Sequence, residues 1–170
     1  MVKVVSKTIE CSAVFSDDEH YRYLLTRTWD KSKPKATVLM LNPSVADVLK
    51  MDKTIMNVMN FLIGSEEYGS LSVVNLYSYV STDPKMLKHR DDDLEAENED
   101  YLDVAFDDSE IIIVAWTRDK YITRKNEVKN KLQNYQDKIR CFEDAAGLKP
   151  RHPRDLGAGW KMVICNLEEL

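Results

Sequence analysis

Apolar and polar positions divide the chain into short, nearly continuous apolar runs and longer stretches with helical spacing. The clearest runs are 36–41, 71–76 and 111–116. Uninterrupted apolar runs of this length are typical of strands that are buried on both faces of a parallel sheet. Each run is separated from the next by a stretch long enough for a crossover helix. We therefore expect an α/β protein with three α/β/α layers, in which these runs are neighbouring central strands of a mostly parallel sheet of about four strands.

Shorter strand patterns lie at both ends of the chain. Residues 8–15 and 21–28 surround a polar turn and predict an N-terminal antiparallel β-hairpin. Residues 139–142 indicate a fourth short strand of the core. Residues 161–165 indicate one more strand at an edge.

Helical spacing appears between the strands. Apolar residues recur at helical intervals from 54 to 63, and Gly64 is expected to close this helix. Asp52 is typical of a helix start, although its carboxylate could instead hold a water. The acidic residues 87–105 suggest a loop followed by a surface helix, and 127–136 suggests a charged helix.

Length and composition fit one domain over residues 1–170, with the hairpin at 8–29 and the core at 36–165. Hydrophobic residues make up 44% of the chain and charged residues 31%, which is enough apolar mass for a core. No apolar run approaches the roughly 20 residues of a membrane span, and the first residues lack the apolar stretch of a secretory signal. We therefore expect a cytoplasmic protein without membrane contact. The three widely spaced cysteines form no CxxC pair, so neither a disulfide framework nor a zinc site is indicated. No other metal and no cofactor are expected.

Charge is distributed unevenly along the chain. The formal net charge is -5, which argues against tight nonspecific binding to duplex DNA, because such binding depends on neutralising phosphates. Acidic residues gather in the stretch 91–108, whereas many lysines and arginines lie in the last third. A local basic patch is compatible with this distribution. The stretch 91–108 could alternatively make the protein an interaction module, and no pattern indicates an oligomeric state.

Polar and aromatic residues follow the predicted strands. Asn42 comes directly after the first buried run, Asn75 lies near the end of the second, and Trp116 ends the third. His152 follows the strand at 139–142 after a loop. In open α/β sheets, ligands bind outside the carboxyl ends of the strands. We therefore expect Asn42, Asn75 and His152 to surround one cleft.

The first of these loops contains Asn42, Pro43 and Ser44, followed by Asp47. Pro43 restricts Asn42 to extended backbone angles, which would aim its side chain reproducibly. The Asn42 amide could hold a water or a base edge, or it could cap the next turn. Ser44 could cap a short helix, and Asp47 could activate a water in place of the amide.

Asn75 and His152 each allow a structural and a functional interpretation. A buried amide costs about 1–3 kcal/mol if it is unpaired, so Asn75 either bonds a neighbouring loop or offers a ligand both a donor and an acceptor. His152 is either a surface histidine or a donor to a developing anion. Arg151 and Arg154 flank it and could contact a phosphate.

These motifs resemble the bacterial and phage domain-of-unknown-function 1643 family. The resemblance runs over roughly residues 20 to 155 and is carried by residues 21–29, 41–47, 52–54, 74–77, 81–84, 115–116 and 147–153. It implies no established activity.

The order of the strand-end motifs also resembles the uracil-DNA glycosylase superfamily. In that superfamily a first strand ends in a water-activating loop, often Asn-Pro, and a second ends in an asparagine that reads a base edge. A third apolar run commonly ends in Trp-Gly, and a fourth strand leads to a His-Pro loop that supports the leaving base and the phosphates. The corresponding residues are Asn42-Pro43, Asn75, Trp116 and His152-Pro153.

This second resemblance implies an N-glycosidase, a hydrolase directed at a nucleobase, a nucleotide or nucleic acid. Asn42 or Asp47 would orient the water, Asn75 would pair with the base, and His152 would support the base oxyanion. The rest of the substrate site would be formed by Pro43, Ser44, Trp116, Arg151 and Arg154. The alternative from the residues is a non-catalytic pocket that captures a nucleotide or a nucleotide-derived signal.

Overall fold

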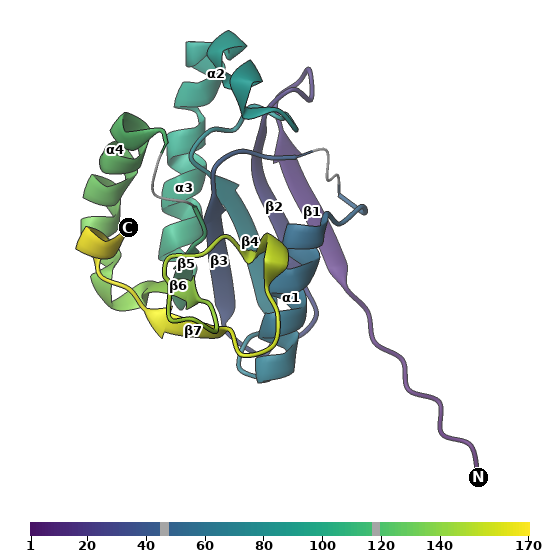
Figure 1. Ribbon diagram of the computed structural model, residues 1–170. Coiled ribbons are helices and arrows are strands. Elements are labelled where there is room, and N and C mark those ends of the chain that lie inside the picture. Colours follow the sequence, from purple (N-terminus) through teal and green to yellow (C-terminus); the bar gives the residue numbers. More distant parts are fainter. Residues whose placement is uncertain (45–47, 117–119) are drawn as a thin grey trace.

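The computed structural model describes residues 1–44, 48–116 and 120–170, and this part of the chain forms one seven-stranded sheet (Figure 1). In chain order the strands are β1 (Glu10–Phe15), β2 (Arg22–Thr28), β3 (Lys35–Met40), β4 (Ser70–Asn75), β5 (Ile111–Val114), β6 (Ile139–Glu143) and β7 (Lys161–Ile164). Across the sheet the order is β1-β2-β4-β3-β5-β6-β7.

The three strongest apolar runs form neighbouring strands at the middle of this sheet. β3 lies between β4 and β5 and pairs in parallel with both, so that Val38 is opposite Val73 on one side and Ile113 on the other. β6 also runs parallel to β5. The prediction that 36–41, 71–76 and 111–116 are adjacent parallel strands is confirmed, although β5 already ends at Val114.

The sheet as a whole is larger and more mixed than the sequence predicted. The pairs β1–β2, β2–β4 and β6–β7 are antiparallel, so the expectation of about four, mostly parallel strands is wrong for the complete sheet. The predicted hairpin is present, but it is not an appendage, because Leu25 of β2 lies opposite Val73 of β4. A strand with an open edge favours pairing with a further strand. Here β2 pairs with the outer edge of β4, and β7 pairs with the outer edge of β6.

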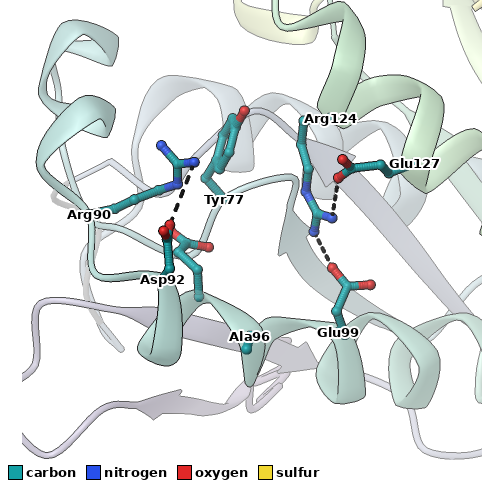
Figure 2. Close-up of a pocket in the computed structure, with 8 residues that line it drawn as sticks. Tyr77, Arg90, Asp92, Ala96, Glu99, Arg124 and Glu127 are labelled. Atoms are coloured by element: carbon teal, nitrogen blue, oxygen red, sulfur yellow. Dashed lines mark hydrogen bonds and ion pairs between the residues drawn. The ribbon is translucent and has the colours of Figure 1, made fainter.

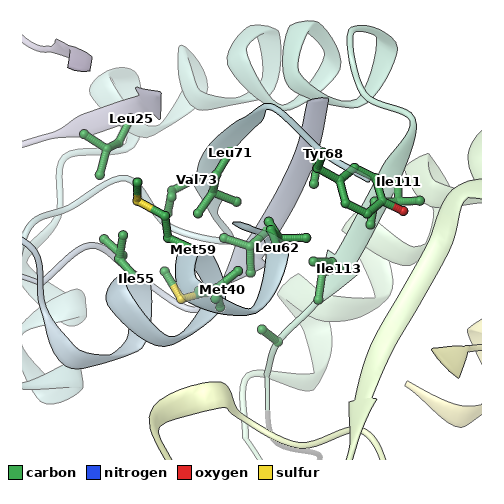
Figure 3. Packing of buried hydrophobic residues seen from close by; sticks show 14 of the residues in the cluster. Leu25, Met40, Ile55, Met59, Leu62, Tyr68, Leu71, Val73, Ile111 and Ile113 are labelled. Atoms are coloured by element: carbon green, nitrogen blue, oxygen red, sulfur yellow. The ribbon is translucent and has the colours of Figure 1, made fainter. Parts of the chain in front are cut away.

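Helices cover both faces of the sheet (Figure 1). On one face α1 (Lys53–Ser65) packs Met59 and Leu62 against Leu71 and Val73 (Figure 3). On the other face α3 (Asn98–Asp107) and α4 (Ile122–Leu132) form a second core with β3, β4 and β5. The shorter elements are α2 (Asp92–Ala96) and the 3-10 turns η1 (Pro84–His89), η2 (Gln133–Lys138), η3 (Pro153–Asp155) and η4 (Leu167–Glu169).

The helix limits differ in detail from the expected ones. Asp52 is the N-cap of α1, because its Oδ1 accepts a hydrogen bond from the Ile55 N–H at 2.8 Å. Gly64 lies inside α1, which ends instead at Ser65 and is capped by Glu66 with a left-handed φ of 60°. α4 begins at Ile122, before the predicted 127–136, and Lys125 in its first turns is buried with its ammonium group over the Trp116 ring. Within the described part of the chain, no helix has both the length and the apolar character that crossing a membrane requires.

Candidate functional site at the carboxyl ends of the strands

The parallel strands bring their carboxyl ends to one edge of the sheet. Met40 at the end of β3 lies opposite Asn75 at the end of β4. On the other side, the N–H of Ala115 just beyond β5 donates to the Leu39 carbonyl at 2.9 Å. The loop that begins at Asn42 therefore starts beside Asn75, as the sequence predicted.

The loop after β4 holds the Asn42 side chain in one orientation. Its Nδ2 donates to the carbonyl of Ser81 at 2.7 Å and to that of Pro43 at 3.1 Å. The Ser81 N–H in turn donates to the Pro43 carbonyl at 2.9 Å. The amide nitrogen thus has a structural role. Among the described residues none donates to Oδ1, which leaves this oxygen as an acceptor.

Asn75 is the residue at this edge that most needs an explanation. Its side chain is 1% exposed, and neither Nδ2 nor Oδ1 has a hydrogen-bond partner in the residues that the structure describes. Because side chains alternate along a strand, Asn75 lies on the α1 face with its neighbour Met40, whereas Val74 packs on the opposite face. An unpaired buried amide costs about 1–3 kcal/mol, and native proteins rarely retain one.

His152 is brought to the first turns of α1 by the turn η3. Asn57 of α1 donates through Nδ2 to the carbonyls of Pro153 at 2.9 Å and Arg154 at 2.8 Å. Lys53 forms an ion pair with Asp155 at 3.3 Å. His152 therefore lies beside the amino end of α1, on the face of the sheet that also carries Asn75.

The environment of His152 fixes both its charge and its tautomer. Burial lowers the pKa of His152, and the positive charge of Arg154 lowers it further, against the opposing fields of Asp52 and Asp155. The imidazole is therefore neutral at neutral pH. Nδ1 accepts a hydrogen bond from the Arg154 N–H at 3.2 Å, so the single ring proton resides on Nε2. His152 thus offers an uncharged N–H donor.

Ser44 and Asp52 connect the first loop to α1. The Ser44 hydroxyl donates to Oδ2 of Asp52, whose Oδ1 caps the helix. Both carboxylate oxygens of Asp52 are therefore engaged, and the prediction of a helix start at this residue is confirmed. The predictions for Asp47, and for a helix that Ser44 would cap, lie outside the described residues.

Two arginines of β2 are buried near this region and were missed by sequence reasoning. Arg22 is 1% exposed and Arg27 is 0% exposed. Arg27 donates to the carbonyls of Val48 at 2.8 Å and Lys50 at 3.3 Å, which holds the chain before α1 against β2. Burial lowers the pKa of Arg22 to about 10, although the negative charge of Asp52 favours its protonated form. With this pKa the Arg22 guanidinium is charged at neutral pH.

Trp116 lies on the opposite face of the sheet from Asn75. Its ring packs in the core beneath α3 and α4, and the ammonium of Lys125 lies 5.8 Å from the ring centroid. Its Nε1 has no partner among the residues described. The structure therefore does not bring Trp116 together with Asn75 and His152.

The two arginines that flank His152 have different environments. Arg151 forms an ion pair with Asp144 at 3.1 Å, and its guanidinium lies 5.8 Å from the centroid of the Trp160 ring. Arg154 is exposed. Of these two arginines, Arg154 is the one that affects His152: its charge lowers the pKa of the imidazole, and its backbone N–H donates to Nδ1.

A pocket of about 200 Å³ opens at the same edge on the α3 and α4 face (Figure 2). Arg124 crosses it, donating to the Leu76 carbonyl at 2.8 Å and pairing with Glu99 and Glu127. These bonds engage every nitrogen of its guanidinium group. The acidic stretch 91–108 is folded here as α2 and α3, so part of its charge is neutralised within the protein. The pocket is lined by Tyr77, Arg90, Asp92, Glu95, Ala96, Glu99, Arg124 and Glu127.

Comparison with known proteins gives one match. A family model described as a protein of unknown function (DUF1643) matches residues 22–154, a range that includes Asn42, Asn75 and His152. No curated protein and no solved structure gives a significant match. The resemblance to the uracil-DNA glycosylase superfamily is therefore not supported by these comparisons. Because the family model covers most of the sequence, the chain belongs to the DUF1643 family.

Proposed function

We propose that the strand-end edge on the α1 face recognises a nucleobase or nucleotide and hydrolyses its N-glycosidic bond. The observation that carries the proposal is the Asn75 side chain, which is 1% exposed with both amide atoms unpaired among the described residues. A ligand that presents a donor beside an acceptor would satisfy both atoms at once, and nucleobase edges have this arrangement. Burial removes the hydrogen bonds that the amide would make to water, and no described residue replaces them. The ligand would supply these missing hydrogen bonds.

The neighbouring groups suit the hydrolysis step. In this step the oxygen of a water forms a bond to the sugar carbon C1′, the electron pair of the breaking bond leaves with the base, and the proton that the water loses passes through solvent to the departing base. Oδ1 of Asn42 would accept a hydrogen bond from that water, since Nδ2 is fixed to the Ser81 carbonyl. The neutral His152 would donate its Nε2 proton in a hydrogen bond to the base oxygen where negative charge develops.

A second candidate function is capture of a nucleotide without catalysis. It is favoured by the state of Asp52, whose Oδ1 caps α1 and whose Oδ2 accepts from Ser44. Both oxygens of this carboxylate already accept structural hydrogen bonds, so the first candidate relies on the amide oxygen of Asn42 to position the water. The same Asn75 contact serves both functions, so the two differ only in whether the ligand is recovered unchanged.

The test is base release from a panel of substrates. The panel contains single- and double-stranded oligonucleotides with uracil or modified bases, nucleosides and nucleotides, and released base is measured by mass spectrometry. Asn75→Leu and His152→Ala should each lower the rate by about two orders of magnitude or more, because each removes a bond to the base in the transition state. The matched controls are Asn130→Leu and His89→Ala, which change the same residue types at exposed positions.

Binding measurements separate the two candidates. If calorimetry detects a nucleotide that Asn75→Leu no longer binds, and that nucleotide is recovered intact, the site is a non-catalytic pocket. If folded protein neither releases base nor binds any member of the panel, both candidates are wrong.

A further inference from the structure

The sheet has an open edge at β1 that continues directly into an exposed segment. β1 pairs with β2 on one side and with no other strand among the described residues. Residues 1–9 precede it and extend away from the sheet (Figure 1). The side chains of this segment are exposed throughout, including Val2 at 94%, Val4 at 86% and Val5 at 67%.

The composition of residues 1–9 is that of a strand. Five of the nine residues are β-branched, and none is glycine or proline. β-Branched side chains favour the pleated conformation when a neighbouring strand covers them. An open edge beside such a segment is a template for pairing with another chain. Within one copy, the direction of the segment away from the sheet prevents it from covering its own β1 (Figure 1).

We propose that two copies of this chain pair through antiparallel strand exchange, in which residues 1–9 of each copy add to the outer edge of β1 in the other. Residues 1–9 run straight into β1. A two-fold axis near this junction therefore places the segment of each copy along the open β1 edge of the other copy. The arrangement is closed, so each copy covers the open edge of the other. The exposed valines then lie beside the side chains of β1 instead of in water.

Charge supports this direction of pairing. Antiparallel pairing about the junction carries Lys3 past the end of β1, to the turn of the other copy that contains Asp17, Asp18 and Glu19. The segment carries Lys3 and Lys7 and no acidic residue. Opposite charges across neighbouring strands stabilise the pairing. A parallel arrangement would instead leave Lys3 remote from this turn.

The test is the oligomeric state of the full chain, measured by sedimentation velocity and light scattering over a wide range of protein concentration. Wild type should form a dimer, and Val4→Glu with Val5→Glu should raise the dimer dissociation constant by about tenfold or more. The matched control is Val104→Glu, an exposed valine of α3 at 56% exposure, which should leave the dimer unchanged. All three positions are exposed, so folding is not at risk.

A charge exchange tests the direction of the strands. Lys3→Glu and Asp17→Lys should each weaken the dimer, and the two together should restore it. The dimer dissociation constant of each single variant should depend less on salt concentration than that of wild type. A monomer at every concentration would overturn the proposal. So would a dimer that tolerates Val4→Glu with Val5→Glu, or open filaments, which would indicate pairing with the edge at β7.

Discussion

Replacing Asn75 by leucine separates the stability of the protein from its proposed activity at a single position. The amide is 1% exposed, and its two polar atoms are without partners among the described residues. In the unfolded chain both atoms bond to water, so folding costs about 1–3 kcal/mol for their desolvation. Leucine has a similar branched shape and no polar atom. We therefore expect Asn75→Leu to stabilise the free protein while abolishing base recognition.

The expected gain is smaller than the full desolvation cost, because leucine is larger than asparagine and overpacking offsets part of it. We expect a net increase of about 1–2 kcal/mol in the free energy of unfolding. For a chain of this size that corresponds to a rise of about 2–8 °C in Tm. The assay is urea unfolding, in which the midpoint should rise at unchanged m-value, together with a thermal melt.

Asn98→Leu is the matched control. Asn98 is also fully buried, but its Nδ2 donates to the Asn75 backbone carbonyl at 2.9 Å. This substitution breaks a buried hydrogen bond and should destabilise the protein by about 1–3 kcal/mol. If Asn75→Leu destabilises the protein as much as Asn98→Leu does, the Asn75 amide is paired in the free protein. Asn75 then has no unsatisfied atoms with which to read a base.

Three further predictions concern the surroundings of the site. Because the pKa of His152 is lowered on folding, the unfolded chain binds the proton first as the pH falls. Stability should therefore decrease below about pH 6.5, and His152→Gln should reduce this loss in urea midpoints measured across that range. Asp52→Ala removes the cap of α1 and the acceptor of Ser44 and should cost about 1–2 kcal/mol in thermal unfolding. Arg27→Met removes the bonds to Val48 and Lys50 and should cost about 2–4 kcal/mol, measured as a lower urea midpoint; an unchanged midpoint would contradict the structural role of Arg27.

The central strands could be predicted because their burial on both faces leaves a local signal in the sequence. Continuous apolar runs such as 36–41 and 111–116 have no polar side to expose. The partner of β2 leaves no such signal, because pairing with β4 depends on which edge is open after the core has assembled. The sequence therefore predicts the hairpin correctly and underestimates the size of the sheet.

The candidate site likewise contains residues that the sequence reveals and residues whose position it does not reveal. Asn75 is visible in the sequence as the one strongly polar residue in an apolar run, and His152 as a histidine in a stiff loop. The burial of Arg22 was not visible, because the pairing of β1 with β2 shifts register between Val14 and Phe15, which interrupts the alternation of faces. The position of Trp116 follows from a register that no local pattern reveals.

Unpaired buried atoms lie on both faces of the sheet, and they bear on which face would hold the proposed ligand. Asn98 Oδ1 and Trp116 Nε1 are unpaired within the described part of the chain, on the face of α3 and α4. Each is a single atom, and Asn98 gains a bond through Nδ2. At Asn75 a donor and an acceptor of one group are unpaired together, so the cost is larger and one ligand edge can satisfy both. His152 adds a neutral donor on that face, whereas Arg124, across the sheet, has all its nitrogens engaged within the protein. Binding energy is gained where folding has left hydrogen bonds unmade, and that condition is met most fully on the α1 face.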